Sequence, residues 1–441
     1  MCASQLLLRR CARAPSVLRL KDGARAASLR RSARSEGKAR TCHEAFATAA
    51  GASGRMSSSA VWQQDQVDHP RVLTYYGREM AVLDAASDGE VALRYLHRPE
   101  RVLLIRSHAS EAAIALAPRV VKFLSSELGL LVYSDEGCVE QVRESGALDC
   151  RDQILPFDAR IRPEIDLVVC LGGDGLLLHI CSQMFGAGFL PPIASFNLGS
   201  MGFMNPFDHT QVFDVLRRIV TRSNDKHPAT VRSRLSLSIS RKGADGHFHV
   251  EQTQVLNDIV LERGNDPGLS NLDAYCDGVL LTRVQADGCV ISTTTGSTAY
   301  SLSCNGSMVH PMVKAILFTP ICPHSLSFRP IILPDTCALI VKPADNARRG
   351  AQVRVDGRSI GPLDKQESLL ISKSAWPVVV FARRSTSEDW FASVRKCLHW
   401  NEMMLEMPFE VDSMDTVQAH DRSTLQTLPG VSHLHREDYL S

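Results

Sequence analysis

An acidic side chain lies inside a glycine-rich turn in residues 166–180, "DLVVCLGGDGLLLHI". The apolar run before the turn indicates a buried strand, and the run after it could open a helix. Backbone N–H groups at such a turn suit nucleotide phosphates, which a carboxylate would repel. In phosphoryl transfer Asp174 could accept the proton of an attacking hydroxyl, or hold the metal ion that neutralises the nucleotide. Either role removes the repulsion.

Three glycines surround this acid, Gly172, Gly173 and Gly175. Because glycine has no Cβ, their backbone could approach phosphates closely. The competing explanation is a left-handed turn in which the Asp caps a helix.

A second stretch, "QADGCVISTTTGSTAYSLSCNG" at residues 285–306, runs from a strand into a Thr/Gly/Ser loop. A short helix follows, begun by Ser297 or Thr298. The hydroxyls, the N–H groups and the aromatic face of Tyr300 predict a nucleoside pocket. Asp287, at the head of the strand, could accept hydrogen bonds from ribose or an amide. The alternative is a hairpin end followed by a capped helix.

A third signal is the Asn257–Asp258 pair inside the apolar strand "QVLNDIVLER" at residues 254–263. Polar side chains there are costly unless they find partners. Asn257 can donate to and accept from an adenine edge, and Asp258 can accept from ribose hydroxyls. A satisfied internal hydrogen-bond network is the competing explanation.

Strands and helices alternate around the first signal, which predicts an α/β domain with a parallel sheet at residues 61–228. Its strands fall near 101–107, 130–136, 165–173 and after 191, with helices near 110–129, 176–186 and 208–221. Both glycine-bearing loops, including "NLGSMGF", would then lie at the carboxyl ends of parallel strands, where open α/β sheets bind ligands.

The periodicity changes near residue 230, where "SRLSLSIS" alternates apolar and small polar residues like a half-buried strand. The Asp277–Gly278 pair between two strand-like runs predicts a hairpin. Short strands continue to about residue 382, so we expect a β-rich, sandwich-like domain at 229–382. A helix within 383–405 would pack back on the first domain, and a polar tail occupies 406–441.

The composition excludes several classes of protein. The 49 Lys and Arg residues balance 48 Asp and Glu residues, so no global positive field favours nucleic acid. No apolar stretch reaches the roughly 18 residues that cross a bilayer, so we expect no membrane partner. The 13 cysteines include no C-x-x-C pair, which disfavours a zinc or redox site.

The first forty residues carry nine arginines against Asp22 and Glu36. We expect residues 1–60 to be a disordered targeting segment, of the kind that directs proteins to organelles. The mitochondrion is the predicted destination. A basic tail on a cytoplasmic enzyme and a plastid location are the alternatives.

Several catalytic motifs are absent from the sequence. It has no G-x-x-x-x-G-K-[ST] loop, no H-E-x-x-H and no G-x-S-x-G. The nearest approach to G-x-G-x-x-G is "GAGFLP" at 186–191, which lacks the third glycine and follows no strand. P-loop kinases and hydride-transferring Rossmann enzymes are therefore disfavoured.

The ordered motifs "LGGDG", "NLGSMGF", "VLND", "DGCVISTTTGSTAY" and "TPICPHSLSFRP" resemble those of the NAD kinase family, in particular its eukaryotic branch. The resemblance covers roughly residues 95–405. It implies an α/β domain followed by a β-rich NAD-binding domain, with the active site in the cleft between them. It also implies transfer of the γ-phosphoryl group of ATP, with Mg²⁺, to the 2′-hydroxyl of the adenosine ribose of NAD, and a dimer or tetramer.

By this resemblance Asp174 would contact the accepting hydroxyl. The implied NAD-binding residues are Phe203, Asn257, Asp258, Asp287, Thr295, Thr298, Ala299, Tyr300 and Ser303. Three positions depart from the family pattern: Leu176 replaces a Thr, Asp258 a Glu and Thr294 a Pro. Leu176 removes a hydroxyl near the phosphates, and we expect activity to survive the changes at 176 and 258. A lipid kinase of the same superfamily and a non-catalytic NAD-binding protein are the alternatives.

Overall fold

The computed structural model describes residues 71–75, 78–85, 90–146, 153–185, 188–199, 202–243, 246–265 and 267–402. The predicted basic segment 1–60 lies outside the described residues, as does the predicted tail 406–441. The described chain up to Trp400 belongs to one compact unit. None of the described helices is both long and apolar enough to cross a membrane.

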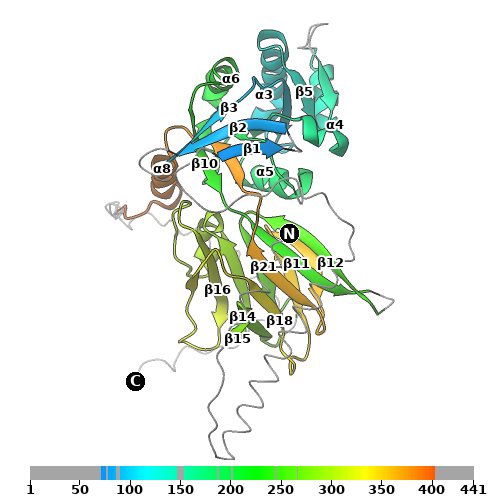
Figure 1. The fold of residues 1–441 in the computed structure, drawn as a ribbon, viewed down its shortest axis with the longest axis vertical. Coiled ribbons are helices and arrows are strands. Elements are labelled where there is room, and N and C mark those ends of the chain that lie inside the picture. Colours follow the sequence, from blue (N-terminus) through cyan, green and yellow to red (C-terminus); the bar gives the residue numbers. More distant parts are fainter. Residues whose placement is uncertain are drawn as a thin grey trace, which may run out of the picture. The chain divides into compact units, whose positions relative to one another are not determined.

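The first part of the chain forms a mixed sheet with helices on it (Figure 1). In spatial order its strands are β1 (Arg71–Tyr75), β2 (Arg78–Ala85), β3 (Val91–Tyr95), β10 (His227–Arg232), β22 (Val378–Phe381), β8 (Ile193–Asn197), β7 (Leu167–Leu171), β4 (Arg101–Arg106), β5 (Leu131–Ser134) and β6 (Ile154–Pro156), and β9 (Phe207–Asp208) pairs with β8. From β22 to β6 all neighbours are parallel.

The predicted parallel sheet is confirmed from β22 to β6, and the other end of the sheet adds antiparallel strands that were not predicted. The β1, β2, β3 and β10 strands pair antiparallel with their neighbours. Strand β22 also lies in this sheet, although its sequence "VVVF" was assigned to the β-rich domain. Its four residues are all buried, and a short apolar run carries no information about which of two sheets it joins.

Helices cover both faces of the first sheet, and alternate residues of its strands therefore pack into two different cores. Val102 and Leu104 of β4 face a core with α3 (Glu111–Lys122), α4 (Glu136–Glu144) and α6 (Val212–Thr221). Leu103 and Ile105 face a second core with α5 (Asp174–His179) and the π-helical turn Ile180–Met184. Leu256, from the β-rich region, joins this second core, so the two regions share apolar packing.

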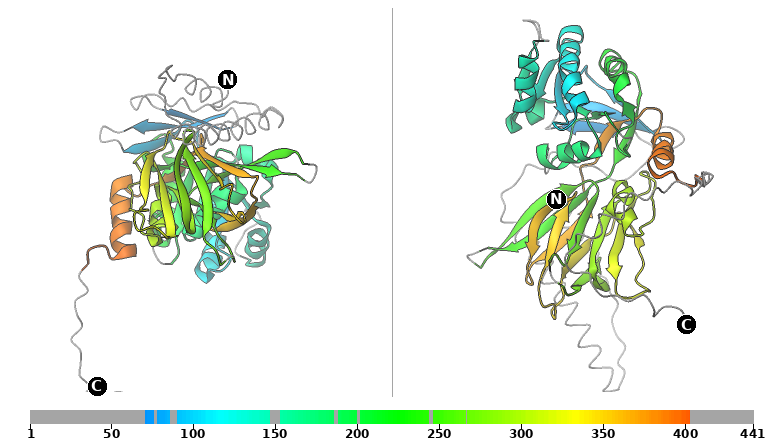
Figure 2. Two further views of the ribbon diagram at one scale, coloured as in Figure 1. Left: turned by 90° about the horizontal axis from the view of Figure 1, so that it is seen from below. Right: turned by 180° about the vertical axis from the view of Figure 1, so that it is seen from behind.

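The β-rich region is one curled antiparallel sheet that encloses its own apolar core (Figure 2). Its strands, in spatial order, are β12 (Phe248–Val255), β11 (Leu235–Lys242), β21 (Ser368–Lys373), β18 (Leu339–Pro343), β14 (Ser270–Cys276), β15 (Val279–Thr293), β13 (Asp258–Glu262), β19 (Ala351–Val355) and β20 (Arg358–Leu363), with β16 (Ala315–Pro323) on β15 and β17 (Ile331–Pro334) on β16. The predicted hairpin at Asp277–Gly278 joins β14 to β15, and both residues have positive φ.

The C-terminal helix α8 (Thr386–Leu398) follows β22 and returns to the first sheet. Its N-cap Ser385 accepts a hydrogen bond from the Glu388 N–H. The Thr386 hydroxyl lies 3.0 Å from that of Thr230 in β10, and the Ser393 hydroxyl donates to the carbonyl of Gly202. The helix therefore packs beside the second glycine-bearing loop.

Candidate active site

The first glycine turn lies at the carboxyl end of β7, and Asp174 is the first residue of α5. The Asp174 carboxylate does not cap its own helix. Its Oδ2 accepts from the Phe203 N–H at 2.8 Å, and its Oδ1 accepts from the Met204 N–H at 3.1 Å and from Asn205 Nδ2 at 2.6 Å. The carboxylate thus joins the two predicted glycine-bearing loops, and the helix-cap explanation is wrong.

Gly202 shows how closely the second loop approaches this carboxylate. A Cβ at residue 202 would lie 2.2 Å from Asp174 Oδ1 and 2.6 Å from its Cγ. Real Cβ atoms do not come this close to other heavy atoms, so the contact requires glycine.

The glycines of the first turn play different parts. A Cβ on Gly172 would lie 2.7 Å from the end of the Leu176 side chain, so Leu176 packs over Gly172. A Cβ on Gly173 or Gly175 would meet nothing within 4 Å, and neither residue has positive φ. The fold itself does not require glycine at 173 and 175, and both leave open space in front of the backbone.

A cavity of about 390 Å³ opens beside this helix. Four predicted site residues line it, Asn257, Asp258, Ala299 and Tyr300. Its other lining residues are Leu178, Val260, Glu262, Arg354, Asp356 and Gly357. Leu178 follows Asp174 by four residues, so one wall residue of the cavity lies about one helical turn, roughly 6 Å of rise, along α5 from Asp174.

The backbone of the Asn257–Asp258 pair is held by the Asp356 carboxylate, which no motif in the sequence indicated. Asp356 accepts from the N–H groups of Leu256 at 3.0 Å, Asn257 at 2.7 Å and Asp258 at 3.3 Å. Asp356 has positive φ and begins the turn between β19 and β20. The Asp356–Gly357 pair is a hairpin signal, but the sequence does not show that this turn faces residue 257.

The Thr/Gly/Ser loop packs directly on the same backbone. A Cβ on Gly296 would lie 2.2 Å from the Asn257 carbonyl oxygen. The Thr293 hydroxyl donates to the Leu256 carbonyl at 2.6 Å and accepts from the Gly296 N–H at 3.1 Å. The helical turns that follow, Thr295–Thr298 and α7 (Tyr300–Ser303), have no side-chain cap, so the predicted start at Ser297 or Thr298 is wrong.

Two buried polar atoms of predicted site residues have no partner among the described residues, Asn257 Oδ1 and Thr295 Oγ1. Asn257 lines the cavity and Thr295 does not. The Asp258 carboxylate is also buried, at 5% exposure, and its neighbour is another carboxylate, Asp356. Burial, followed by the charge of Asp356, raises the pKa of Asp258 to about 7. The pair is therefore not a satisfied internal network, and a polar ligand would complete it.

The structure does not bring every predicted residue to the cavity. Asp287 lies within β15 rather than at its head, and it forms an ion pair with Arg263 at 2.8 Å. Thr298 donates to the Thr295 carbonyl at 3.2 Å, and Ser303 is exposed at the end of α7. These three are not among the residues that line the cavity.

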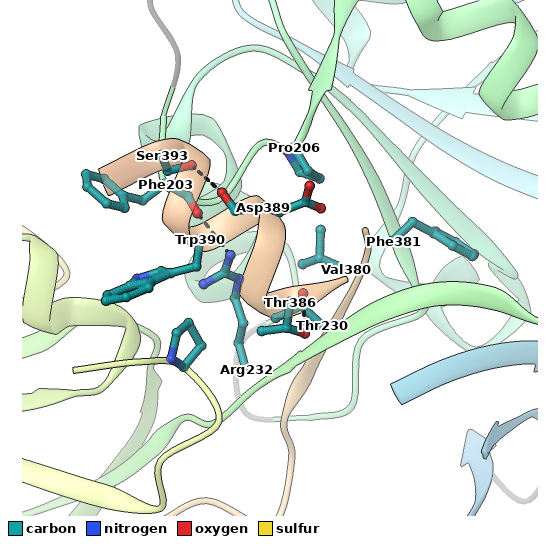
Figure 3. Close-up of a pocket in the computed structure, with 11 residues that line it drawn as sticks. Phe203, Pro206, Thr230, Arg232, Val380, Phe381, Thr386, Asp389, Trp390 and Ser393 are labelled. Atoms are coloured by element: carbon teal, nitrogen blue, oxygen red, sulfur yellow. Dashed lines mark hydrogen bonds between the residues drawn. The ribbon is translucent and has the colours of Figure 1, made fainter. Parts of the chain in front are cut away.

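Phe203 instead lines a small hollow beneath α8, together with Thr230, Arg232 and Trp390 (Figure 3). The Phe203 carbonyl accepts from Arg232 Nη2 at 3.0 Å. Arg232 is 7% exposed, and burial lowers its pKa. Its attraction to Asp174 opposes that effect, so a buried cation lies close to the Asp174 carboxylate. The sequence gives no sign of this contact, because Arg232 ends an ordinary strand.

The described residues contain no group of three His, Cys, Asp or Glu side chains able to hold a metal ion. Mg²⁺ commonly binds through one or two carboxylates together with substrate phosphates, and needs no such group. The Asp174 carboxylate already accepts three hydrogen bonds, so the phosphates of a bound nucleotide would supply most of the ligands that such an ion lacks here.

A glycine turn at the carboxyl end of a parallel strand, with a cavity beside it, is the arrangement in which open α/β sheets bind their ligands. Two family models match the chain: the ATP-NAD kinase N-terminal domain over residues 98–224 and the ATP-NAD kinase C-terminal domain over residues 256–382. The chain belongs to the NAD kinase family, as the motifs predicted.

Three known proteins illustrate the likeness. "NAD kinase 2, chloroplastic" of Arabidopsis thaliana is 44% identical over 246 residues, which are 55% of this chain and 25% of that protein. The mitochondrial NADH kinase of Saccharomyces cerevisiae is 48% identical over 178 residues, 40% of this chain and 41% of that one. The crystal structure of yeast NADH kinase complexed with NADH has a TM-score of 0.67 and 31% identity, over 73% of this chain and 94% of that chain.

The chain spans 25% to 64% of the lengths of the first curated relatives that it matches. These relatives confirm the eukaryotic branch of the family, and the structural match confirms the fold class. They do not favour the lipid kinase alternative.

Proposed function

We propose that the chain transfers the γ-phosphoryl group of ATP to the 2′-hydroxyl of the adenosine ribose of NAD, which produces NADP. The observation that carries this proposal is the cavity in which Asn257 and Asp258 meet helix α5, about one turn from Asp174. The family membership and the NADH complex of the yeast relative support it.

Recognition of the dinucleotide falls to the cavity wall in this proposal. The unpartnered Asn257 Oδ1 would accept a hydrogen bond from the adenosine, and the Thr295 hydroxyl could donate or accept one. The Asp258 carboxyl would bind a ribose hydroxyl. Tyr300, which is 40% exposed, presents an aromatic surface for a base. A substrate would thus supply the partners that these buried atoms lack.

Asp174 would orient the accepting hydroxyl and take its proton late. A ribose hydroxyl is a poor nucleophile, but a loose phosphoryl-transfer transition state allows late proton loss, so positioning carries most of the effect. Three donors already fix the Asp174 carboxylate. A fixed carboxylate loses little orientational freedom when the substrate binds.

The glycine turn would receive the phosphates of ATP. The open space in front of Gly173 and Gly175 leaves room for phosphate oxygens to reach the backbone. Leu176, where the family has Thr, packs on Gly172 and supplies no hydroxyl, so we expect a weaker contact with the donor. Mg²⁺ would arrive with ATP, bound through its phosphates, and would neutralise their charge.

The remaining partners are proposals of the same kind. We propose a homo-oligomer, a dimer or a tetramer, as the family resemblance implies. A mitochondrial location is proposed from the arginine-rich first forty residues, and the relatives include both mitochondrial and chloroplastic proteins. Imaging of the full chain fused to a fluorescent protein at its C-terminus tests the location.

The activity is tested with the full chain, Mg²⁺ and ATP, offered NAD, NADH, diacylglycerol or sphingosine in separate reactions. We expect NADP from NAD, detected with an NADP-specific dehydrogenase. NADPH from NADH alone would redefine the acceptor, and phosphorylation of a lipid alone would reject the proposal. NAD binding by calorimetry without turnover of any acceptor would indicate the non-catalytic alternative.

A further inference from the structure

Asn205 connects the Asp174 carboxylate to the interior of the first sheet. Its side chain is 2% exposed, and its Nδ2 donates to Asp174 Oδ1 at 2.6 Å. On its other side Asn205 Oδ1 accepts from the hydroxyl of Ser195 in β8. Since a hydroxyl and a carboxylate lie on opposite sides, only one orientation of the amide satisfies both.

The Ser195 hydroxyl is itself fixed by the sheet. Ser195 is completely buried, and it lies directly across from Cys170 of β7, whose thiol is hydrogen-bonded to it. The contacts therefore run from β7 through β8 and Asn205 to Asp174, which begins the helix after β7. A closed path of this kind leaves the carboxylate little freedom to rotate.

Only one of the three donors to Asp174 depends on a side chain. Phe203 and Met204 use backbone N–H groups, which any residue provides, whereas Asn205 uses its amide. Oδ1 accepts two hydrogen bonds and Oδ2 accepts one. Each carboxylate oxygen offers about two acceptor sites, so among the described residues one site on Oδ2 has no donor.

We propose that Asn205 is a positioning residue for Asp174: its amide saturates Oδ1 and so directs the open acceptor site of Oδ2 to the substrate hydroxyl. This inference rests on the proposed function, because it assigns Asn205 to the step in which Asp174 orients that hydroxyl. It also requires an uncharged partner. An amide donates to Asp174 without adding a charge, whereas a carboxylate at 2.6 Å would have to share a proton with it.

The other ionisable groups near Asp174 are Arg232 of β10, Cys170 of β7 and Cys397 of α8. Burial raises the pKa of Cys170 to about 12 and also raises that of Cys397, so neither thiol ionises at neutral or acid pH. Arg232 keeps its charge over the same range. A change in the acid limb of a rate profile would therefore report on the Asp174 site rather than on these neighbours.

The test compares Asn205→Asp with the full-length wild type in the NADP-forming assay from pH 5 to pH 9. We expect the acid limb of kcat to move up by about one pH unit or more, because the two carboxyl groups share a proton. A residue that only holds the loop would lower the melting temperature and leave the limb in place. Asn271→Asp is the matched control, since Asn271 lies in β14 and its amide Nδ2 donates to Asn346 Oδ1 at 3.0 Å.

Asn205→Ala removes the donor without adding a charge, and we expect kcat to fall about 10- to 100-fold with the KM for NAD little changed. Ser195→Ala removes the contact that orients the amide, so it should lower kcat by a few-fold. It should add almost nothing in the Asn205→Ala background. If the Asn205 variants do not fold, Ser195→Ala decides the matter alone: an unchanged kcat would overturn the proposal.

Different results would reject the positioning role of Asn205 and the proposed function. If Asp174→Asn is inactive while the Asn205 variants keep the wild-type kcat and acid limb, the positioning role is rejected and the proposed function stands. If the wild type forms no NADP from NAD, the proposed function fails and takes this inference with it. A shifted acid limb in Asn205→Asp, with the Asn271→Asp profile unchanged, supports the positioning role.

Discussion

The carboxylates of Asp174 and Asp258 lie in two regions of one site, and their surroundings differ sharply. The Asp174 carboxylate accepts three N–H hydrogen bonds from consecutive residues of a single loop. No described donor contacts the Asp258 carboxyl, which is buried next to Asp356 and whose pKa is raised to about 7. The sequence predicts both as site residues, because an acid is unusual in a glycine turn and inside an apolar strand. The fold gives hydrogen-bond donors to the first and none among the described residues to the second.

The difference separates a positioned group from a group that awaits a partner. Hydrogen bonds that already hold a carboxylate cost nothing further when substrate binds, and that suits an oriented catalytic acid or base. A buried carboxyl without donors is unfavourable until a ligand supplies them. We therefore expect Asp174 to influence the rate and Asp258 to influence binding and the pH dependence of stability.

The largest expected effect is that of Asp174→Asn. Loss of a positioned general base typically costs about 10²- to 10⁴-fold, so kcat for NADP formation should fall by that factor. The new amide would also direct an NH₂ group at one of the three donors, which costs about 1–3 kcal/mol of stability. Steady-state kinetics measures the first effect and urea unfolding the second.

The assignment of Asp174 to the rate and of Asp258 to binding would be contradicted if Asp174→Asn had the wild-type kcat, or if it no longer bound NAD. Calorimetric titration with NAD separates these results. Asp258→Asn is the matched variant, and for it we expect a raised KM for NAD with a smaller change in kcat.

The second prediction concerns stability and uses Asp258→Asn. The folded-state pKa of Asp258 is about 7, above its unfolded value near 4, so the folded protein binds the extra proton. The contribution of Asp258 to stability is then greatest below pH 4, is lost as pH rises from 4 to 7, and stays lost above 7. Removing the charge should recover at most roughly 4 kcal/mol above pH 7, because three pKa units correspond to that amount.

Urea unfolding at pH 4, 5.5 and 8 measures this difference. Asp364→Asn, at an exposed position, is the control and should show no pH-dependent gain. An Asp258 variant whose stability changes equally at all three values would mean that burial does not penalise this charge.

The third prediction concerns the fit of the loop at Gly202 around the Asp174 carboxylate. In Gly202→Ala the new Cβ would lie 2.2 Å from Asp174 Oδ1, so the loop or the carboxylate must move. We expect kcat to fall by up to about 100-fold, with a loss of about 1–3 kcal/mol in stability. Gly199→Ala is the control in the same loop, since its Cβ would meet nothing within 4 Å. Equal kcat values for the two variants would show that the fit around Asp174 is not needed.

Much of the fold could be predicted from the sequence, because the spacing of apolar residues indicates which face of a helix or strand is buried. The helix α3, the strand β7 and the hairpin at Asp277–Gly278 all lie where their patterns predicted. The motifs also predicted Asn257, Asp258, Ala299 and Tyr300 as residues of one site, and in the structure all four line one cavity. The early strands β1 to β3 were not foreseen, and the apolar strand β22 was assigned to the wrong sheet.

The sequence by itself determined which local elements form and which residue types could bind phosphates and a nucleoside, since glycines, acids and hydroxyls act over a few neighbouring residues. Only the tertiary structure decided that Asp356 holds the Asn257 backbone from 99 residues away, that Asn205 donates to Asp174, and that the charge of Arg232 attracts Asp174. The physical reason is that a hydrogen bond or a buried charge depends on distance in space. Pairing between strands far apart in the chain sets that distance, and no local pattern records it.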